Sequence, residues 1–107
     1  MQNSRINEND QAILKIKASV KKLKVYSDKL QLEAKAQDAK IKEWIKEKQK
    51  DRAVLALRIK KLKLKELEKA DGAMFMLQET ISNIESAQMD VNVMQAMKQG
   101  EKVLSEL

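Results

Sequence analysis

Residues 13–44 read ILKIKASVKKLKVYSDKLQLEAKAQDAKIKEW, and their apolar side chains recur alternately three and four residues apart. The members of this stripe are Ile13, Ile16, Val20, Leu23, Leu30, Ala34, Ile41 and Trp44, with Ser27 and Gln37 as polar interruptions. Such spacing places the apolar side chains along one side of a long α-helix and is typical of helices that pack against another helix. The stretch therefore predicts a long helix with one apolar seam.

Charge is distributed unevenly along the chain. Residues 1–69 contain 20 lysines and arginines against 10 acidic residues, whereas residues 70–107 contain 2 against 6, which gives net charges of +10 and −4. A helix with one apolar seam and an otherwise cationic surface can hold a partner helix and still attract something anionic. We therefore expect an interaction or scaffold protein rather than an enzyme.

The composition predicts an all-α fold and removes several kinds of chemistry. The 107 residues include no proline, 2 glycines and only 3% aromatic residues, too few for a conventional globular core. Without cysteine or histidine, the chain has no thiolate nucleophile and lacks the commonest general base and zinc ligand. We predict no catalytic residues, no cofactor and no metal site. Because no apolar run approaches the ~20 residues that span a bilayer, the predicted location is the cytoplasm or the cytoplasmic face of a membrane.

The helical pattern divides into two segments. We expect a first helix over residues 8–46, with Asn7 as its N-cap, and a second helix over residues 52–97. Between them, residues 47–51 carry no apolar side chain and form the predicted tip of a hairpin. Because this run has no glycine or proline, periodicity alone also allows one continuous rod.

The second helix has a less regular stripe. It comprises Leu55, Ile59, Leu62, Leu67, Ala70, Met74, Leu77, Ile81, Ile84 and Val91. Glu66 occupies an expected apolar position, so we predict a register slip between Leu62 and Ala70. Gly100 follows the last good repeat and is a candidate hinge, after which residues 98–107 form either an elbow with a short third helix or a continuous extension of the second helix. Two helices that bury one seam hardly offset their chain entropy, so we also expect self-association, a missing segment or a partner.

Four stretches resemble the core of ESCRT-III subunits, the charged multivesicular body proteins. They are residues 9–17 (NDQAILKIK), residues 47–57 (EKQKDRAVLAL) with the Lys60-Lys61 pair that follows, residues 84–87 (IESA) and residues 94–100 (MQAMKQG). Their order and spacing look most like the subunit that bridges ESCRT-II to the growing filament. The resemblance implies an antiparallel two-helix hairpin over residues 1–107 that polymerises on acidic endosomal membranes, takes part in membrane remodelling and multivesicular body sorting, and acts as a filament nucleator docked on ESCRT-II.

The same resemblance implies the partners and the location. The partners are an acidic membrane surface, ESCRT-II, and other ESCRT-III subunits or further copies of this chain, with no nucleic acid, and the location is peripheral on the endosomal membrane. Two departures stand out, because Gln2 replaces the myristoylated glycine expected of the bridging subunit, and family members are longer, with acidic C-terminal helices that fold back on the core and bind the disassembling ATPase. We therefore expect a core fragment without a lipid anchor and without the means to recruit that ATPase.

Basic residues of the second helix are the candidate membrane contacts. Arg58, Lys61, Lys65 and Lys69 lie three, four and four residues apart and so share one face of the helix. By resemblance to the family's filament-forming subunit, Lys50, Arg58, Lys61 and Lys69 match positions whose side chains contact acidic lipid headgroups. Each basic residue near an anionic leaflet contributes about 1 kcal/mol, and such binding weakens with salt. From charge spacing alone, a merely solvated lysine face is the alternative.

A second apolar strip lies outside the seam of the first helix. It consists of Leu14, Ala18, Val25 and Leu32, bordered by Lys21 and other lysines. Scattered apolar residues are normal on protein surfaces. The first helix of this family docks ESCRT-II and neighbouring protomers, so the resemblance implies a partner contact here, and spacing does not distinguish these two partners.

Two other functions fit the same pattern. A lysine-rich coiled coil can bind nucleic acid through its phosphates, although three arginines and three aromatic residues offer few groups for base recognition or stacking. A purely structural coiled coil forms a closed dimer at every concentration, whereas a filament subunit shows open-ended growth. A gel shift with duplex DNA, liposome sedimentation and light scattering distinguish these alternatives from the membrane role.

Overall fold

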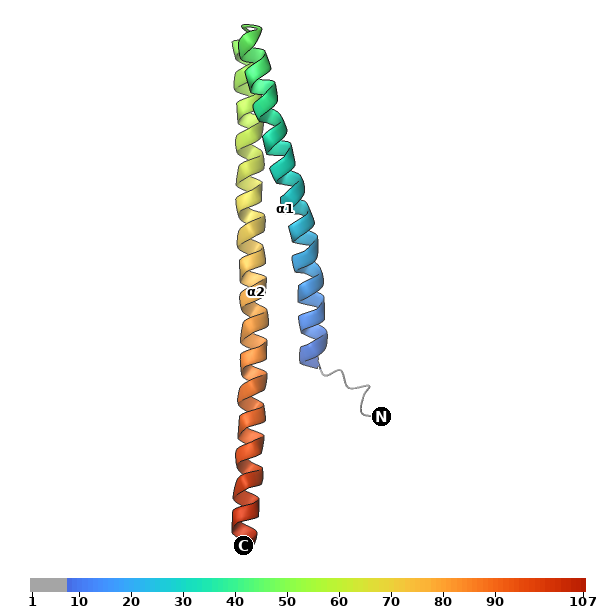
Figure 1. Cartoon of the computed structure of the whole chain (residues 1–107), viewed down its shortest axis with the longest axis vertical. Helices are drawn as coiled ribbons and strands as arrows, with labels where there is room; N and C mark the ends of the chain where they lie inside the picture. Colours follow the sequence, from blue (N-terminus) through green and yellow to red (C-terminus); the bar gives the residue numbers. More distant parts are fainter. Residues whose placement is uncertain (1–7) are drawn as a thin grey trace.

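Two long helices joined at one end form the whole of the described fold. The computed structural model describes residues 8–107, in which α1 spans Glu8–Lys46 and α2 spans Lys50–Glu106. The helices run antiparallel as an elongated hairpin with principal extents of 89 × 26 × 13 Å (Figure 1). The predicted all-α hairpin is thus confirmed, and the single rod that periodicity also allowed is excluded. The predicted N-cap Asn7 lies outside the described residues.

The tip of the hairpin is a tight helix end rather than a loop. The Lys48 amide donates to the Ile45 carbonyl at 3.0 Å and the Gln49 amide to the Trp44 carbonyl at 2.8 Å, while Lys48 has a left-handed φ of 58°. This pair of bonds is the Schellman motif, which satisfies the last carbonyls of a helix and reverses the chain. The Ala53 amide then donates to the Gln49 carbonyl at 3.0 Å, and α2 begins. The turn occupies residues 47–49, so α2 starts two residues earlier than predicted.

The seam of α1 matches the predicted stripe. Ser27, Leu30, Ala34 and Gln37 are buried, and the remaining stripe residues are half-buried. Ser27 keeps its hydroxyl satisfied by donating to Asp71 Oδ1 of α2 at 3.1 Å. The Gln37 side-chain oxygen is buried without a partner among the described residues. The two predicted polar interruptions are therefore seam positions, one paired across the hairpin and one unpaired.

The seam of α2 differs from the prediction near the tip. Its buried or half-buried side chains follow an unbroken heptad pattern through residues 53, 56, 60, 63, 67, 70, 74, 77, 81, 84 and 88. Leu55, Leu62 and Val91, which were predicted to lie in the seam, are instead 57%, 63% and 47% exposed. The predicted register slip is wrong, because the spacing of three and four residues continues without a break. Ala53, Ala56, Lys60 and Lys63 occupy the seam near the tip, where Leu55 and Leu62 were expected.

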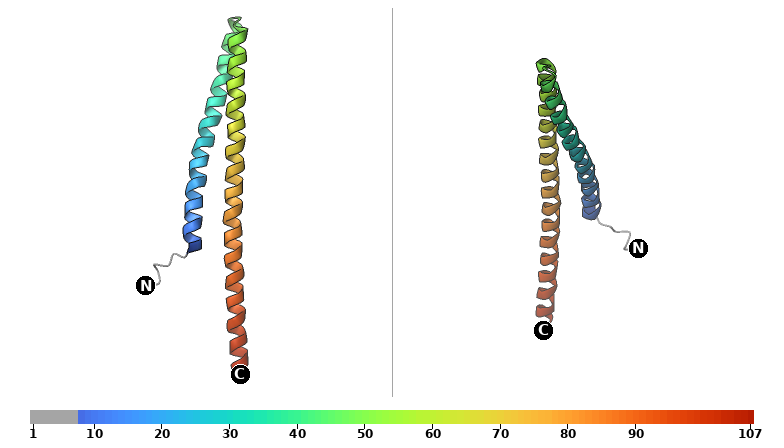
Figure 2. Two further views of the ribbon diagram at one scale, coloured as in Figure 1. Left: turned by 180° about the vertical axis from the view of Figure 1, so that it is seen from behind. Right: turned by 45° about the horizontal axis from the view of Figure 1, so that its top comes forward.

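The two helices differ in length, so part of α2 has no partner in the hairpin. Asn9 Nδ2, at the start of α1, donates to Gln88 Oε1 at 2.7 Å, which marks the end of the overlap. Beyond it, residues 89–106 continue as helix past the start of α1, as both views of Figure 2 show. We call residues 89–106 the C-terminal extension. Of the two arrangements considered for residues 98–107, the structure has the continuous one, without an elbow at Gly100, and the predicted helix end at residue 97 is wrong. No helix in residues 8–107 is long and apolar enough to cross a membrane.

Candidate membrane and partner surfaces

The lysines of α2 fall into two sets with different surroundings. Lys60 Nζ lies 2.7 Å from Asp38 Oδ1, and Lys63 Nζ lies 3.1 Å from Glu33 Oε1, so both form ion pairs across the hairpin. These four side chains are about one-third to one-half exposed, which limits each pair to a modest contribution of roughly 0.2–1 kcal/mol. Lys60 and Lys63 are therefore seam residues, each paired with a carboxylate of α1.

The second set points away from the seam. Arg58, Lys61 and Lys65 are exposed, and none of them has a carboxylate within ion-pair distance among residues 8–107. The three side chains surround one shallow hollow together with Leu62. Lys69 continues the same face but lies 3.6 Å from Glu66 in an exposed pair within the helix. We call Arg58, Lys61, Lys65 and Lys69 the basic stripe.

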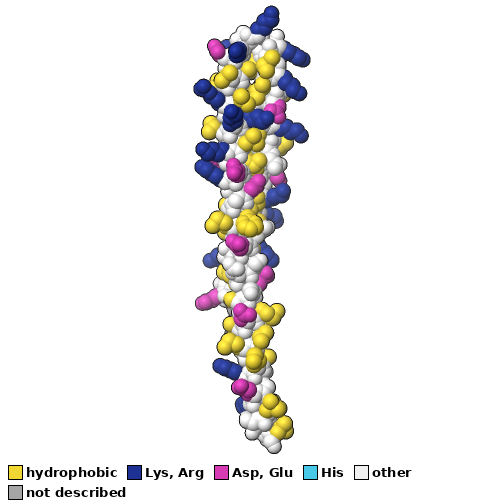
Figure 3. Space-filling view, turned by 90° about the vertical axis from the view of Figure 1, so that its left-hand side faces the viewer, with side chains coloured by type: hydrophobic (Ala, Val, Ile, Leu, Met, Phe, Trp, Pro, Cys, Tyr) yellow, Lys and Arg dark blue, Asp and Glu magenta, His cyan; other side chains and the backbone are white. Residues whose placement is uncertain are grey.

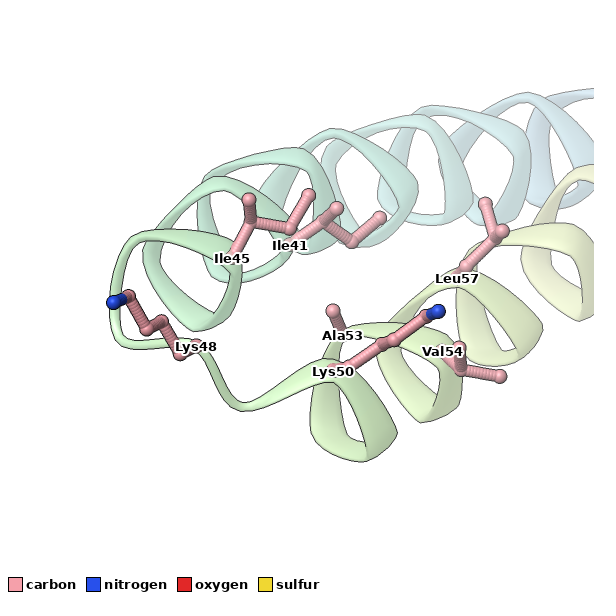
Figure 4. Close-up of a pocket in the computed structure, with 7 residues that line it drawn as sticks. All are labelled: Ile41, Ile45, Lys48, Lys50, Ala53, Val54 and Leu57. Atoms are coloured by element: carbon pink, nitrogen blue, oxygen red, sulfur yellow. The ribbon is translucent and has the colours of Figure 1, made fainter.

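Lys50, the fifth predicted membrane contact, lies about two helical turns before Arg58 on the same side of α2 as the basic stripe. It is the first residue of α2 and lines a groove of about 600 Å³ at the hairpin tip. Ile41 and Ile45 from α1 meet Ala53 and Leu57 from α2 in this groove, with Lys50 beside the turn (Figure 4). Lys50 therefore extends the face of the basic stripe toward the hairpin tip.

Basic side chains cover the tip half of the hairpin and become sparse toward the C-terminus. Figure 3 shows blue side chains along the upper part of the molecule and mainly hydrophobic side chains on the visible face of its lower part. On the opposite side of the tip from the groove of Lys50, the Arg52 guanidinium lies 5.0 Å from the centre of the Trp44 ring. This distance is that of a cation–π contact, which lies at the end of the seam.

The predicted partner strip on α1 lies outside the seam, where it was expected. Leu14, Val25 and Leu32 are 59%, 66% and 70% exposed, and Ala18 and Lys21 are exposed as well. These five residues follow a heptad pattern on the side of α1 opposite the α2 contact. The hairpin itself therefore leaves this strip uncovered.

A third apolar strip lies on the C-terminal extension and was not predicted from the sequence. Met89, Val93, Met97 and Leu104 share one side of the helix and are 61%, 49%, 65% and 71% exposed. Their spacing of four, four and seven residues could have revealed the strip in the sequence. It was missed because Val91 was assigned to a continuation of the seam, which ends at Gln88.

The candidate sites of the structure are exposed faces of its two long helices. Among residues 8–107, no three acidic side chains gather as a group that could hold a metal ion. The recurring features are long helical faces, one of them cationic and two of them apolar. Together they give the described residues an elongated shape with three exposed helical faces.

Comparison with known proteins gives the family. Residues 11–107 match the Snf7 family. The chain is 31% identical over 104 residues to charged multivesicular body protein 6-A of Xenopus laevis, an alignment that covers 97% of this chain and 52% of that protein. It is 33% identical over 100 residues to vacuolar protein sorting-associated protein 20 homolog 1 of Arabidopsis thaliana, covering 94% of this chain and 46% of that protein. The chain therefore belongs to the Snf7 (ESCRT-III) family, which confirms the resemblance, and it spans about half the length of these relatives.

Proposed function

We propose that this chain is the core of a structural ESCRT-III subunit that assembles on acidic endosomal membranes and takes part in multivesicular body sorting. The family membership and the names of its relatives, charged multivesicular body protein 6 and vacuolar protein sorting-associated protein 20, support this role. The observation that carries the membrane part is the basic stripe, whose Arg58, Lys61 and Lys65 have no acidic partner among the described residues. In this proposal the protein is peripheral, binds without catalysis and needs no cofactor.

The physical basis is attraction between the basic stripe and lipid phosphates. Each lysine or arginine close to an anionic leaflet contributes about 1 kcal/mol, and the attraction extends over a Debye length of about 10 Å at 0.1 M salt. Lys60 and Lys63 add little to this attraction because their charges are compensated by Asp38 and Glu33. The membrane contact is thus formed by Arg58, Lys61, Lys65 and Lys69, with Lys50 added where the tip meets the surface.

The test compares two matched charge reversals. Reversing Lys61 and Lys65 together (Lys61→Glu, Lys65→Glu) is expected to weaken binding to phosphatidylserine vesicles at least about tenfold, because four unit charges change at the contact. The control reverses Lys98 and Lys102, two exposed lysines of the C-terminal extension, and is expected to bind like the wild type. Sedimentation is measured at protein concentrations where the chain is monomeric. The membrane role would be dismissed if the wild type bound neutral vesicles as well as phosphatidylserine vesicles, or if the two variants lost the same amount of binding.

We further propose that the exposed strip of α1 is a contact for ESCRT-II or for a neighbouring subunit. Leu14, Val25 and Leu32 leave more than half of their surface exposed, and burying such side chains drives association. Val25→Lys is expected to weaken binding to ESCRT-II, or to other copies of the chain, without changing helicity. Titration calorimetry with ESCRT-II and light scattering of the chain alone distinguish the two partners, and an unchanged result in both would dismiss the contact.

A further inference from the structure

Leu62 lies in the middle of the basic stripe and is 63% exposed. The hollow around it is formed by Arg58, Lys61, Leu62 and Lys65, and its surface consists entirely of apolar atoms. The leucine and the aliphatic stems of its basic neighbours thus form one small apolar patch, with the positive charges at the ends of those stems. Arg58, Lys61 and Lys65 border the leucine on one side, and Glu66, one helical turn further along, lies on the other side and pairs with Lys69.

The fold holds Leu62 outward. Lys60 and Lys63, on either side of it in the sequence, occupy seam positions and are tied to Asp38 and Glu33 of α1 at 2.7 Å and 3.1 Å. Rotation of α2 that brought Leu62 into the seam would break both ion pairs and expose Ala56 and Ala70, which are 4% exposed. The hairpin therefore keeps most of the leucine side chain exposed.

Single exposed leucines are common and by themselves carry no meaning. Leu62 differs because the basic side chains beside it attract anionic surfaces and so bring the leucine into contact with them. A surface of phosphates draws Arg58, Lys61 and Lys65 toward it, and flexible basic side chains can bend back to the headgroups while the apolar patch between them goes deeper. A leucine in the same position gains nothing from contact with a water-soluble polyanion.

We propose that Leu62 inserts into the boundary between headgroups and acyl chains of an anionic bilayer. The insertion gives the basic stripe a component of binding that salt does not screen. This inference rests on the proposed membrane role and adds the residue that distinguishes a lipid surface from other polyanions.

The first test separates the apolar component from the electrostatic one. Leu62→Ser is expected to lose about tenfold in affinity for phosphatidylserine vesicles at both low and high salt, since burial of a leucine is insensitive to screening. The slope of affinity against salt concentration stays at the wild-type value, because no charge changes. Phe75→Ser is the matched control, since Phe75 is 66% exposed on the same helix but lies beyond the basic stripe. It is expected to bind like the wild type.

The second test places a reporter at the same residue. The chain has no cysteine, so Leu62→Cys gives one site for an environment-sensitive fluorophore, with Phe75→Cys as the control. The label at residue 62 is expected to shift to the blue on anionic vesicles and to be quenched by lipids brominated near the headgroup, whereas the label at residue 75 shows neither change. Circular dichroism verifies that each variant keeps its helicity.

The outcomes distinguish a failure of the Leu62 insertion from a failure of the membrane role itself. A wild-type chain that binds the vesicles, together with equal binding by Leu62→Ser or an unshifted label at residue 62, would overturn the insertion and leave the membrane role intact. A wild-type chain that fails to bind anionic vesicles would overturn both. A blue shift at residue 62 on duplex DNA equal to that on vesicles would also overturn the insertion.

Discussion

Lys48 reverses the chain at the hairpin tip without help from glycine or proline. Its φ of 58° lies in the left-handed region, where an L-residue pays a steric cost of about 1–2 kcal/mol. The two hydrogen bonds of the Schellman motif, at 3.0 Å and 2.8 Å, and the packing of the two helices maintain this conformation. The position is one where glycine is the residue most often found.

We predict that Lys48→Gly stabilises the hairpin by about 0.5–1 kcal/mol, because glycine adopts the left-handed conformation without a Cβ clash while its larger unfolded-state entropy offsets part of the gain. Lys46→Gly is the matched control, since Lys46 is the last residue of α1. It is expected to destabilise, as glycine does inside helices. Urea unfolding followed by circular dichroism measures both, and a loss of stability in both variants would contradict the role of φ.

The exact position of the turn at Lys48 could not be predicted from the sequence. The tip was placed at residues 47–51 from the absence of apolar side chains, and the turn occupies residues 47–49. No turn-forming residue type marks it, so the choice between hairpin and rod came from the family resemblance alone. A left-handed lysine leaves no signature in a sequence.

At the scale of the element, α1 was predictable and the first half of α2 was not. The α1 stripe is apolar at nearly every seam position, and periodicity identifies it. In α2, alanines and the paired lysines Lys60 and Lys63 occupy the seam, whereas Leu55 and Leu62 face solvent. A lysine can occupy a seam position when a carboxylate lies opposite it, and that requires the register between two helices, which one helix does not reveal. Charge spacing within one helix was more informative, because it selected the exposed Arg58, Lys61, Lys65 and Lys69 and left out Lys60 and Lys63, which are paired across the hairpin.

We predict that the ion pair between Lys60 and Asp38 helps to set this register. Asp38→Lys and Lys60→Asp are each expected to destabilise the hairpin, and the double swap is expected to recover about 0.5 kcal/mol or more of coupling in a double-mutant cycle. The control is the pair of Lys24 and Asp28, 3.4 Å apart within α1, whose swap leaves the contact between helices untouched. Thermal unfolding measures the cycle, and additive effects of the single changes at Lys60 and Asp38 would argue against a role in register.

The glycine of the C-terminal extension gives a second prediction for α2. Gly100 lies in continuous helix, and a Cβ added there meets no atom within 4 Å. Gly100→Ala is therefore expected to stabilise the local helix by about 1 kcal/mol and to slow amide exchange around residue 100 about fivefold. If Gly100 is a hinge, the same change also narrows the distribution of distances between spin labels at residues 93 and 107. Gly72→Ala, in the paired part of α2 with equally free space, is the control that leaves these distances unchanged. Equal distance distributions in all three proteins would dismiss the hinge.

At the scale of the whole molecule, the unequal helices separate two kinds of surface. The hairpin end carries most of the net charge of +10 that residues 1–69 hold, and the C-terminal extension lies within residues 70–107, whose net charge is −4. The extension has an exposed apolar strip, and α1 has another on the side away from the seam. The C-terminal extension itself holds Asp90, Glu101 and Glu106 against Lys98 and Lys102, a net charge of −1. Two copies can therefore meet through unlike surfaces, the apolar and weakly acidic extension of one against the basic side of the next, and a contact between unlike surfaces allows open-ended growth.

We predict that this charge asymmetry controls self-association. Reversing Glu101 and Glu106 to lysine brings the net charge of residues 70–107 from −4 to 0, and it is expected to shift growth to higher protein concentration at low salt. Reversing Lys98 and Lys102 to glutamate brings it to −8 and is expected to shift growth to lower concentration, so the two variants bracket the wild type. At high salt, the wild type and both variants are expected to begin to grow at the same protein concentration, because screening removes the contribution of charge and leaves that of the apolar contact. Multi-angle light scattering across a concentration series measures the effect. A closed dimer of constant mass in all three proteins would contradict open-ended association, and shifts in the same direction for both variants would show that helix perturbation rather than charge is responsible.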